Sequence, residues 1–228
     1  MVEFSIIMSC LNNVDNTKET VKSIIDNAGD QDNYELIITN DGSTDGTREF
    51  LGTIECKNLY IINNTGNIGV PKSMNRMMKR AKGRYVLRVD NDIKLITEHF
   101  LNKMKLWFDK IPSLGAVACI TDRCGGPGAG HTPDNVTSSI WFTNVISGYC
   151  LMMKAYILEE VEYIDENYPK MYGEDRDLVL KINQEHDTGL CFNVFCFHKA
   201  RKTVDPNSEV GRQYVSKSNE LIIEKWVE

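Results

Sequence analysis

The fold is decided by residues 4–39, where FSIIMSC (Phe4–Cys10) is followed by TKETVKSIIDN (Thr17–Asn27) and then by YELIIT (Tyr34–Thr39). The first and third segments are short and β-rich, which is typical of buried strands. In the middle segment Val21, Ile24 and Ile25 recur at helical spacing, so we expect a helix with one face on the sheet. This order is a βαβ unit, which predicts parallel strands joined by a crossover helix.

The same alternation continues along the chain. We predict further strands at Leu59–Asn63, Tyr85–Val89, Gly115–Ile120 and Leu190–Phe197, and helices at Thr44–Leu51, Val70–Ala81, Thr97–Phe108 and Asp175–Gln184. The predicted fold class is α/β, with a mixed, mainly parallel sheet flanked by helices in a single domain over residues 1–200. Residues 201–228 form a polar tail, and its apolar Leu221–Ile223 and Trp226 predict a terminal helix that packs back or joins two copies of the chain.

Composition narrows the class of protein. A net charge of −6 supplies no broad cationic field, so nucleic acid is an unfavourable partner. No apolar run approaches the roughly 18 residues that a membrane-spanning helix needs, and no basic leader opens the chain. We therefore expect a cytoplasmic protein, at most peripheral on a membrane. Seven scattered cysteines without a C-x-x-C pair predict buried, reduced thiols.

Two polar loops follow predicted strands. NDGSTDGT (Asn40–Thr47) comes after the second strand, and NTGNIGVP (Asn64–Pro71) comes after the third. Open α/β sheets bind ligands beyond the carboxyl ends of their strands, and glycines let the backbone pass close to a ligand. The first loop is equally consistent with a turn that caps the next helix, so each loop alone leaves both interpretations open.

A third motif, RVDND (Arg88–Asp92), ends the predicted fourth strand. Alternation along a strand places Asp90 and Asp92 on the same side. Two converging carboxylates repel each other unless a cation lies beside them, and Mg²⁺ and Mn²⁺ favour oxygen ligands that they share with substrate phosphates. The alternative is a solvated acidic turn.

A fourth motif, YGEDRD (Tyr172–Asp177), begins a predicted helix. Acidic residues in the first turn of a helix often complement its dipole, so this motif alone has an ordinary structural explanation. Between the third and fourth motifs, Thr121–Ser139 is rich in glycine and has no periodicity. A loop of this length is typical of a functional segment, and we expect a lid.

In order and spacing, the four motifs resemble the family 2 glycosyltransferases of the GT-A fold, over roughly residues 4–200. The resemblance rests on NDGSTDGT, on the spacing N-x-G-x-x-x-x-x-N from Asn67 to Asn75, on Asp90-Asn91-Asp92 and on Glu174-Asp175. It implies a Rossmann-like domain that transfers a sugar from a nucleoside diphosphate sugar, a UDP-sugar above all. The acceptor is then a hydroxyl of a glycan, a lipid-linked molecule, a protein or another compound.

The resemblance also implies a role for each site residue. The donor-binding residues are Ser9, Cys10, Leu11, Asp41, Asn67, Gly69, Asn75, Asp90 and Asn91. Asp92 and His198 would ligate Mn²⁺ or Mg²⁺. Asp175 would be the general base of an inverting transfer, and Glu174 would orient or assist it.

The chain departs from the family pattern after the first strand, where Ser9-Cys10 replaces the usual proline-threonine. A Q-x-x-R-W string is absent, which favours a single transfer per encounter over processive synthesis. Two other functions stay open. A sugar-phosphate nucleotidyltransferase would carry a G-x-G-T-R-type opening, which is missing here, and a non-catalytic nucleotide-sugar-binding protein would need no base.

Overall fold

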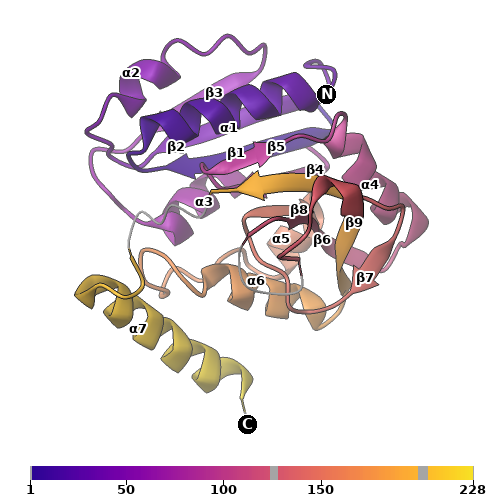
Figure 1. The fold of residues 1–228 in the computed structure, drawn as a ribbon. Coiled ribbons are helices and arrows are strands. Elements are labelled where there is room, and N and C mark those ends of the chain that lie inside the picture. The colour runs from indigo at the N-terminus through magenta and orange to yellow at the C-terminus, as the bar shows by residue number, and fades with distance from the viewer. Residues whose placement is uncertain (1, 124–127, 200–204, 228) are drawn as a thin grey trace.

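The structure is a computed structural model that describes residues 2–123, 128–199 and 205–227, and this part of the chain folds around one sheet of nine strands (Figure 1). The strands are β1 (Phe4–Cys10), β2 (Tyr34–Asn40), β3 (Leu59–Asn63), β4 (Tyr85–Val89), β5 (Ile93–Leu95), β6 (Leu114–Thr121), β7 (Ile140–Phe142), β8 (Cys150–Lys154) and β9 (Asp187–His198). The helices are α1 (Val14–Asn27), α2 (Thr47–Leu51), α3 (Val70–Met78), α4 (Phe100–Lys110), α5 (Ala155–Glu160), α6 (Glu174–Asn183) and α7 (Glu209–Trp226), and a 3₁₀ turn spans Pro133–Asn135.

The sheet is mixed. Its strand order is β3-β2-β1-β4-β8-β6-β9-β5, with β7 paired to β9. Strands β1 to β4 run parallel, as the βαβ pattern predicted. The second half of the sheet adds antiparallel pairs, because β8 runs against β4 and β6 while β5 and β7 run against β9. The predicted α/β fold with one large flanked sheet is confirmed.

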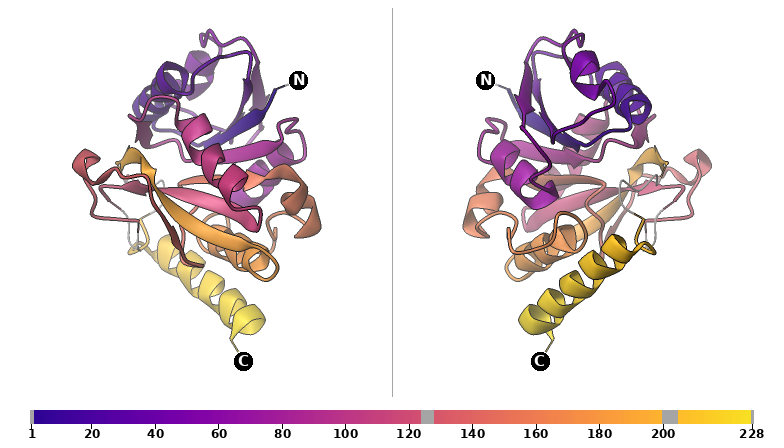
Figure 2. Two further views of the ribbon diagram at one scale, coloured as in Figure 1. Left: turned by 90° about the vertical axis from the view of Figure 1, so that its right-hand side faces the viewer. Right: turned by 90° about the vertical axis from the view of Figure 1, so that its left-hand side faces the viewer.

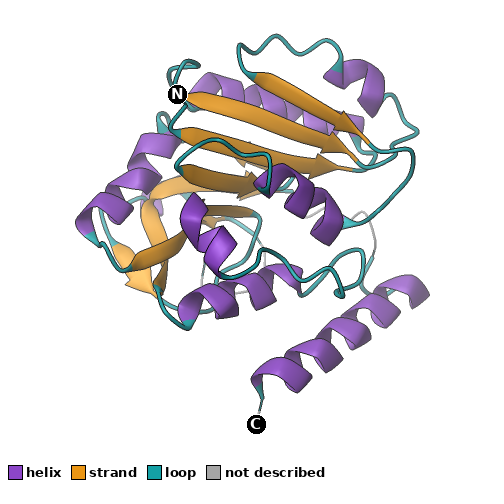
Figure 3. Cartoon of the chain, turned by 180° about the vertical axis from the view of Figure 1, so that it is seen from behind, coloured by secondary structure: helices purple, strands orange, loops and turns teal. Residues whose placement is uncertain are grey.

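Helices cover both faces of the sheet and bury two separate apolar layers (Figure 3). Along β1, Phe4, Ile6 and Met8 join the layer under α1 and α4, while Ile7 joins the layer under α3, α5 and α6. Side chains of a strand alternate between faces, so one short strand contributes to both layers. Met74, Met77 and Met78 form a methionine stripe on one face of α3 and pack in the second layer. Their spacing of three and four residues places them on the same face of a helix.

Several boundaries differ from the predicted ones by about three residues, and one strand was not predicted. Helices α2 and α4 begin later than predicted, at Thr47 and Phe100, and α3 ends earlier, at Met78.

Helix α1 begins at Val14, before the predicted Thr17, and it follows Asn12 and Asn13, which both have positive φ angles. The buried residues of its first turn, Asn16 and Thr17, are polar, so the apolar pattern could not mark it. Strand β5 is three residues long and was not predicted, because its pairing with β9 rather than its own pattern defines it.

The predicted terminal helix is present and packs back on the domain, where α7 lies below α6 (Figures 1 and 2). The indole nitrogen of Trp226 donates to the buried carboxylate of Asp177 at 3.0 Å, and Ile222 is buried. None of the described helices is long and apolar enough to cross a membrane. The predicted domain boundary at residue 200 falls in 200–204, outside the described residues, and stays a prediction.

The predicted lid lies partly outside the described residues, which omit 124–127 and with them Cys124. Its described ends are fastened to the sheet, since the amide of Thr121 donates to the Gly128 carbonyl and that of Thr137 donates to the Phe192 carbonyl, both at 2.8 Å. Among the described cysteines, Cys10, Cys119, Cys150, Cys191 and Cys196 are buried, and none forms a disulfide.

The close approach of the turn before β4 to β1 generates a stability prediction. A Cβ at Gly83 would lie 2.5 Å from the backbone of Phe4 and Ser5. We expect Gly83→Ala to lower the free energy of unfolding by about 1–3 kcal/mol, because backbone atoms cannot move aside cheaply. Gly66→Ala is the matched control, with open space around its Cβ, and should change it by less than about 0.5 kcal/mol. Urea denaturation measures both, and equal effects would contradict the predicted contact.

Candidate active site

A cavity of about 320 Å³ opens where β1, β2 and β4 end. Parallel strands end at the same edge of a sheet, so the polar loops that follow them meet there. All the site residues predicted from the sequence line this cavity except Cys10 and Asn75. The described residues of the predicted lid are not among its lining residues.

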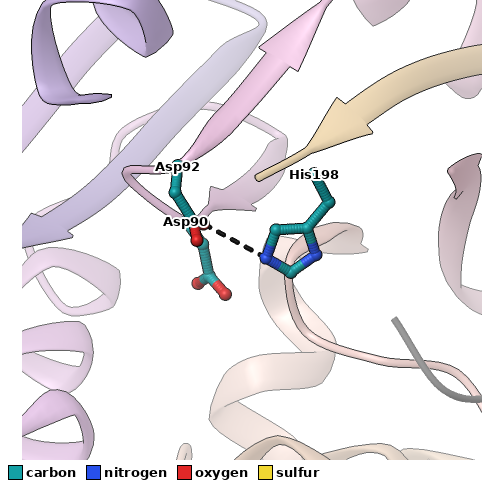
Figure 4. A group of neighbouring side chains, drawn as sticks. All are labelled: Asp90, Asp92 and His198. Carbon is teal, nitrogen blue, oxygen red and sulfur yellow. Dashed lines mark ion pairs between the residues drawn. The ribbon is translucent and has the colours of Figure 1, made fainter. Parts of the chain in front are cut away.

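The acidic motif forms a turn between two strands. Strand β4 ends at Val89, and β5 begins at Ile93, so Asp90 and Asp92 converge through this turn rather than by strand alternation. Antiparallel pairing of Ile93 with His198 then brings the end of β9 alongside. The Nε2 atom of His198 lies 3.2 Å from the nearer carboxylate oxygen of Asp92 (Figure 4).

The residues of this turn fit a divalent cation. One ligand atom each from Asp90, Asp92 and His198 lies within 4.8 Å of the other two. Burial raises the pKa of Asp90, and the neighbouring Asp92 carboxylate adds to the increase while Arg88 opposes it. A bound cation would favour the ionised form, and a set of two carboxylates with one imidazole suits Mn²⁺ better than the harder Mg²⁺. Asp90 thus joins a group that the sequence analysis limited to Asp92 and His198.

Asp41 follows β2 and organises the wall of the cavity on the side of β1 that lies away from the acidic turn. One oxygen of its buried carboxylate accepts hydrogen bonds from the Asn64 side chain at 2.8 Å and from the Ile68 amide at 2.9 Å. The other oxygen accepts from the Gly69 amide at 2.9 Å. The carboxylate therefore folds the loop of residues 64–69 around itself, and this loop brings Asn67 and Gly69 to the cavity.

Two predicted donor-binding residues, Asn75 and Cys10, are not among the residues that line the cavity, and their predicted role in donor binding stays a prediction. The Asn75 amide group donates to the carbonyl of Ile164 at 2.8 Å and accepts from the Ile164 amide at 3.0 Å. It fastens α3 to the segment after α5. Cys10 is buried, its thiol donates to the Thr39 carbonyl at 3.4 Å, and burial raises its pKa to about 12. Motif spacing identified both positions, but it cannot tell a framework residue from a contact residue.

The acidic pair of the fourth motif begins α6, behind the left-handed Gly173. One carboxylate oxygen of Asp175 accepts from the Gly148 amide at 2.8 Å, and the other accepts from the Arg176 amide at 2.8 Å. Asp175 is half-buried and lines the cavity, so its carboxylate is held in place and still reaches a ligand. Glu174 is buried behind it.

The sequence analysis missed Arg88, which is 4% exposed and lies at the base of the cavity. Its Nη2 atom donates to Glu174 at 3.0 Å, and its Nε atom lies 3.4 Å from a carboxylate oxygen of Asp90. Burial raises the pKa of Glu174 to about 7, although the guanidinium opposes the increase. The sequence feature that could have identified Arg88 is an arginine inside an otherwise apolar strand. A buried charge requires a partner, so such an arginine indicates a polar group nearby.

The other missed residues come from irregular or terminal segments. Lys170, Met171 and Tyr172 precede α6, and Tyr214 comes from α7. The ammonium group of Lys170 donates to the Asn67 carbonyl at 2.8 Å and joins this wall to the loop of residues 64–69. Of these four residues only Tyr172 lies within one of the four motifs, and it was not predicted as a site residue. Val70 and Met74 of α3 also line the cavity and were not predicted as site residues.

The buried ion pair generates a second prediction. Removing one partner leaves an uncompensated buried charge, so we expect Arg88→Met to lower the free energy of unfolding by roughly 3–5 kcal/mol. In the double variant Arg88→Met/Glu174→Leu neither charge remains, so the loss should be smaller than the sum of the single losses. Denaturation of the three variants at one pH measures this coupling. Additive losses would show that the pair does not act as a unit.

Comparison with proteins of known sequence identifies the family of this chain. The model of the family Glycosyl transferase family 2 matches residues 5–192. An uncharacterized glycosyltransferase of Haemophilus influenzae is 26% identical over 189 residues, which cover 75% of this chain and 57% of that protein. The UDP-Glc:alpha-D-GlcNAc-diphosphoundecaprenol beta-1,3-glucosyltransferase WfaP of Escherichia coli is 32% identical over 41% of this chain and 40% of its own length. The chain thus spans less than two thirds of each relative.

A solved structure agrees with the fold. The mannosyltransferase PcManGT from Pyrobaculum calidifontis, solved in complex with GDP-Man and Mn²⁺, superposes with a TM-score of 0.76 at 19% identity. The match covers 98% of this chain and 64% of that one, and at this identity it speaks for the fold alone. With the family model matched across the sheet and the four motifs gathered at one edge of it, the chain belongs to glycosyl transferase family 2.

Proposed function

We propose that this chain transfers a sugar from a nucleoside diphosphate sugar to an acceptor hydroxyl, with inversion at the anomeric carbon. One observation carries the proposal: the Asp175 carboxylate lines the same cavity as Asp90, Asp92 and His198. A base and a metal-binding group that face one space are what a direct displacement requires. A nucleotide-sugar-binding protein without activity would need no such base.

On the donor side, Asp90, Asp92 and His198 would hold Mn²⁺ or Mg²⁺ beside the diphosphate. When bound, the cation neutralises charge on the phosphates and on the departing nucleoside diphosphate. The Asp41-organised loop and the end of β1, with Ser9 and Leu11, form the wall for the nucleoside. Asn67, Gly69 and Asn91 line the space between them.

On the other side, Asp175 accepts the proton of the acceptor hydroxyl as the oxygen attacks the anomeric carbon. The two backbone amides that bond its oxygens keep the carboxylate aimed while leaving it in contact with the cavity. Attack opposite the leaving group inverts the configuration, and no covalent enzyme intermediate is needed. Glu174 acts indirectly, because it is buried against Arg88 and holds the start of α6.

We favour uridine diphosphate as the nucleotide of the donor, because the E. coli relative is named for the donor UDP-Glc. The acceptor is a glycan or a lipid-linked saccharide, again by analogy with that relative, and transfer is non-processive. A lipid-linked acceptor would bring the chain to a membrane surface as a peripheral protein.

A third prediction concerns the metal. Asp92→Ala removes one carboxylate of the metal-binding group, so the affinity for UDP in the presence of Mn²⁺ should fall by about tenfold or more. Isothermal titration calorimetry with Mn²⁺ and with a chelator measures it. Asp109→Ala, on the exposed end of α4, removes a carboxylate far from the cavity and should bind as the parent does. Equal affinity of the parent chain with metal and with chelator would exclude a metal-dependent donor site.

A fourth prediction concerns the base. Asp175→Asn keeps the shape of the side chain but removes its proton affinity, so transfer should fall by roughly 10²–10⁴-fold while donor binding stays. Release of the nucleoside diphosphate from several nucleotide sugars, with and without Mn²⁺, identifies the donor first, and the variant is then assayed with it. A folded Asp175→Asn variant that binds donor and reacts at the rate of the parent would refute this role.

A further inference from the structure

We propose that α7 forms the acceptor wall of the cavity and that Tyr214 binds a carbohydrate acceptor through its ring. The proposal rests on the function proposed above and adds the helix and the residue that bind the saccharide acceptor. Tyr214 is half-buried and lines the cavity together with Tyr172 and Asp175. The matched family range ends at residue 192, so this wall belongs to a part of the chain beyond it.

The position of Tyr214 follows from the face of α7 that meets the domain. Ser218 is buried one helical turn later, and its hydroxyl donates to the Tyr172 carbonyl at 2.6 Å. A Cβ at Gly173 would lie 2.8 Å from the Ser218 Cβ, so the helix approaches this turn closely. Residues four apart share one face of a helix, which sets Tyr214 beside the same turn. That turn leads directly into Glu174 and Asp175, so the ring lies on the side of the base.

Helix α7 is anchored to the domain at two points, through Ser218 and through Trp226. At its far end the Trp226 indole donates to Asp177 at 3.0 Å, and the buried Ile222 packs between the two anchor points. At the near end the Ser218 hydroxyl donates to the Tyr172 carbonyl. Tyr172 has a left-handed φ of 75°, which is strained for a residue other than glycine, and this hydrogen bond helps to hold the turn. The wall is therefore built into the domain rather than loosely attached to it.

The chemistry of this wall indicates an acceptor rather than the donor. The nucleoside and diphosphate contacts proposed above come from β1, the loop of residues 64–69 and the acidic turn, all in the first half of the chain or at the end of β9. Because the base takes the proton of the attacking hydroxyl, the wall on the side of Asp175 is the one that meets the acceptor. A tyrosine offers an apolar ring and a polar tip, which match the C–H face and the hydroxyls of a sugar ring.

The test uses three probes, the 4-nitrophenyl pyranosides of glucose, galactose and N-acetylglucosamine, added to the full chain loaded with UDP and Mn²⁺. Ligand-observed NMR titrations give the affinity for each. We expect the parent to bind at least one glycoside and Tyr214→Ala to bind it about tenfold more weakly, since the stacking surface is lost. Tyr214→Phe keeps the ring and should stay within about threefold. Gln213→Ala, an exposed neighbour on the same helix, is the matched control and should bind as the parent does.

UDP affinity is measured in parallel and should be unchanged in all variants. If Tyr214→Ala does not fold, Tyr214→Gln retains a side chain of intermediate size without a ring and is expected to show the same loss. The proposal is overturned if the parent binds none of the three glycosides, if the ring-less variant binds them as Gln213→Ala does, or if UDP affinity falls along with glycoside affinity. Metal-dependent UDP binding by the parent that survives any of these outcomes leaves the proposed function standing and removes this inference alone.

Discussion

The arrangement of the cavity depends on one buried guanidinium. Arg88 lies in the middle of the sheet, on β4, and it contacts the carboxylate of Asp90 on one side and that of Glu174 on the other. These carboxylates belong to segments more than eighty residues apart in the sequence, the acidic turn and the first turn of α6. Because a buried charge without a partner is costly, the pairing fixes the distance between the candidate metal group and the candidate base. Gly148 shows how tight this arrangement is, since a Cβ there would lie 2.7 Å from the Asp175 Cβ and 2.9 Å from the Arg88 guanidinium carbon.

The parts of the fold that the sequence predicts are those whose signals are local. The β1–α1–β2 unit, the methionine stripe of α3 and the clustering of polar loops at one edge all follow from periodicity and from the geometry of parallel strands. Strand β5 could not be found this way, because three residues carry no period and their pairing partner is a hundred residues away. Yet this short strand sets His198 beside Asp92, so a long-range contact completes the group.

Motif spacing marks residues near the cavity, but it does not say in which direction a side chain points. Asn75 and Cys10, which the resemblance assigns to the donor, do not line the cavity and form hydrogen bonds to Ile164 and Thr39. Their role in donor binding stays a prediction. Arg88 and Tyr214 line the cavity and were not predicted as site residues. For Arg88 the sequence holds a signal, an arginine inside an apolar strand, but its partner Glu174 is set by the tertiary fold. For Tyr214 the sequence holds none, because α7 reaches the cavity only through its packing on the domain.

Under the proposed function, the charges around the cavity would make donor binding depend on a bound metal ion. Asp90, Asp92, Glu174 and Asp175 line the same space, and Arg88 is already engaged by two of them. A diphosphate entering alone would meet carboxylates at close range, and burial has raised the pKa of Asp90 and Glu174 already, which shows how poorly this space accommodates further negative charge. A divalent cation would reverse that balance on the donor side. On the acceptor side no such reversal is needed, since a sugar hydroxyl is neutral and adds no charge to the cavity. The same excess of acidic groups therefore ties the proposed donor site to a cation and leaves the proposed acceptor site without that requirement.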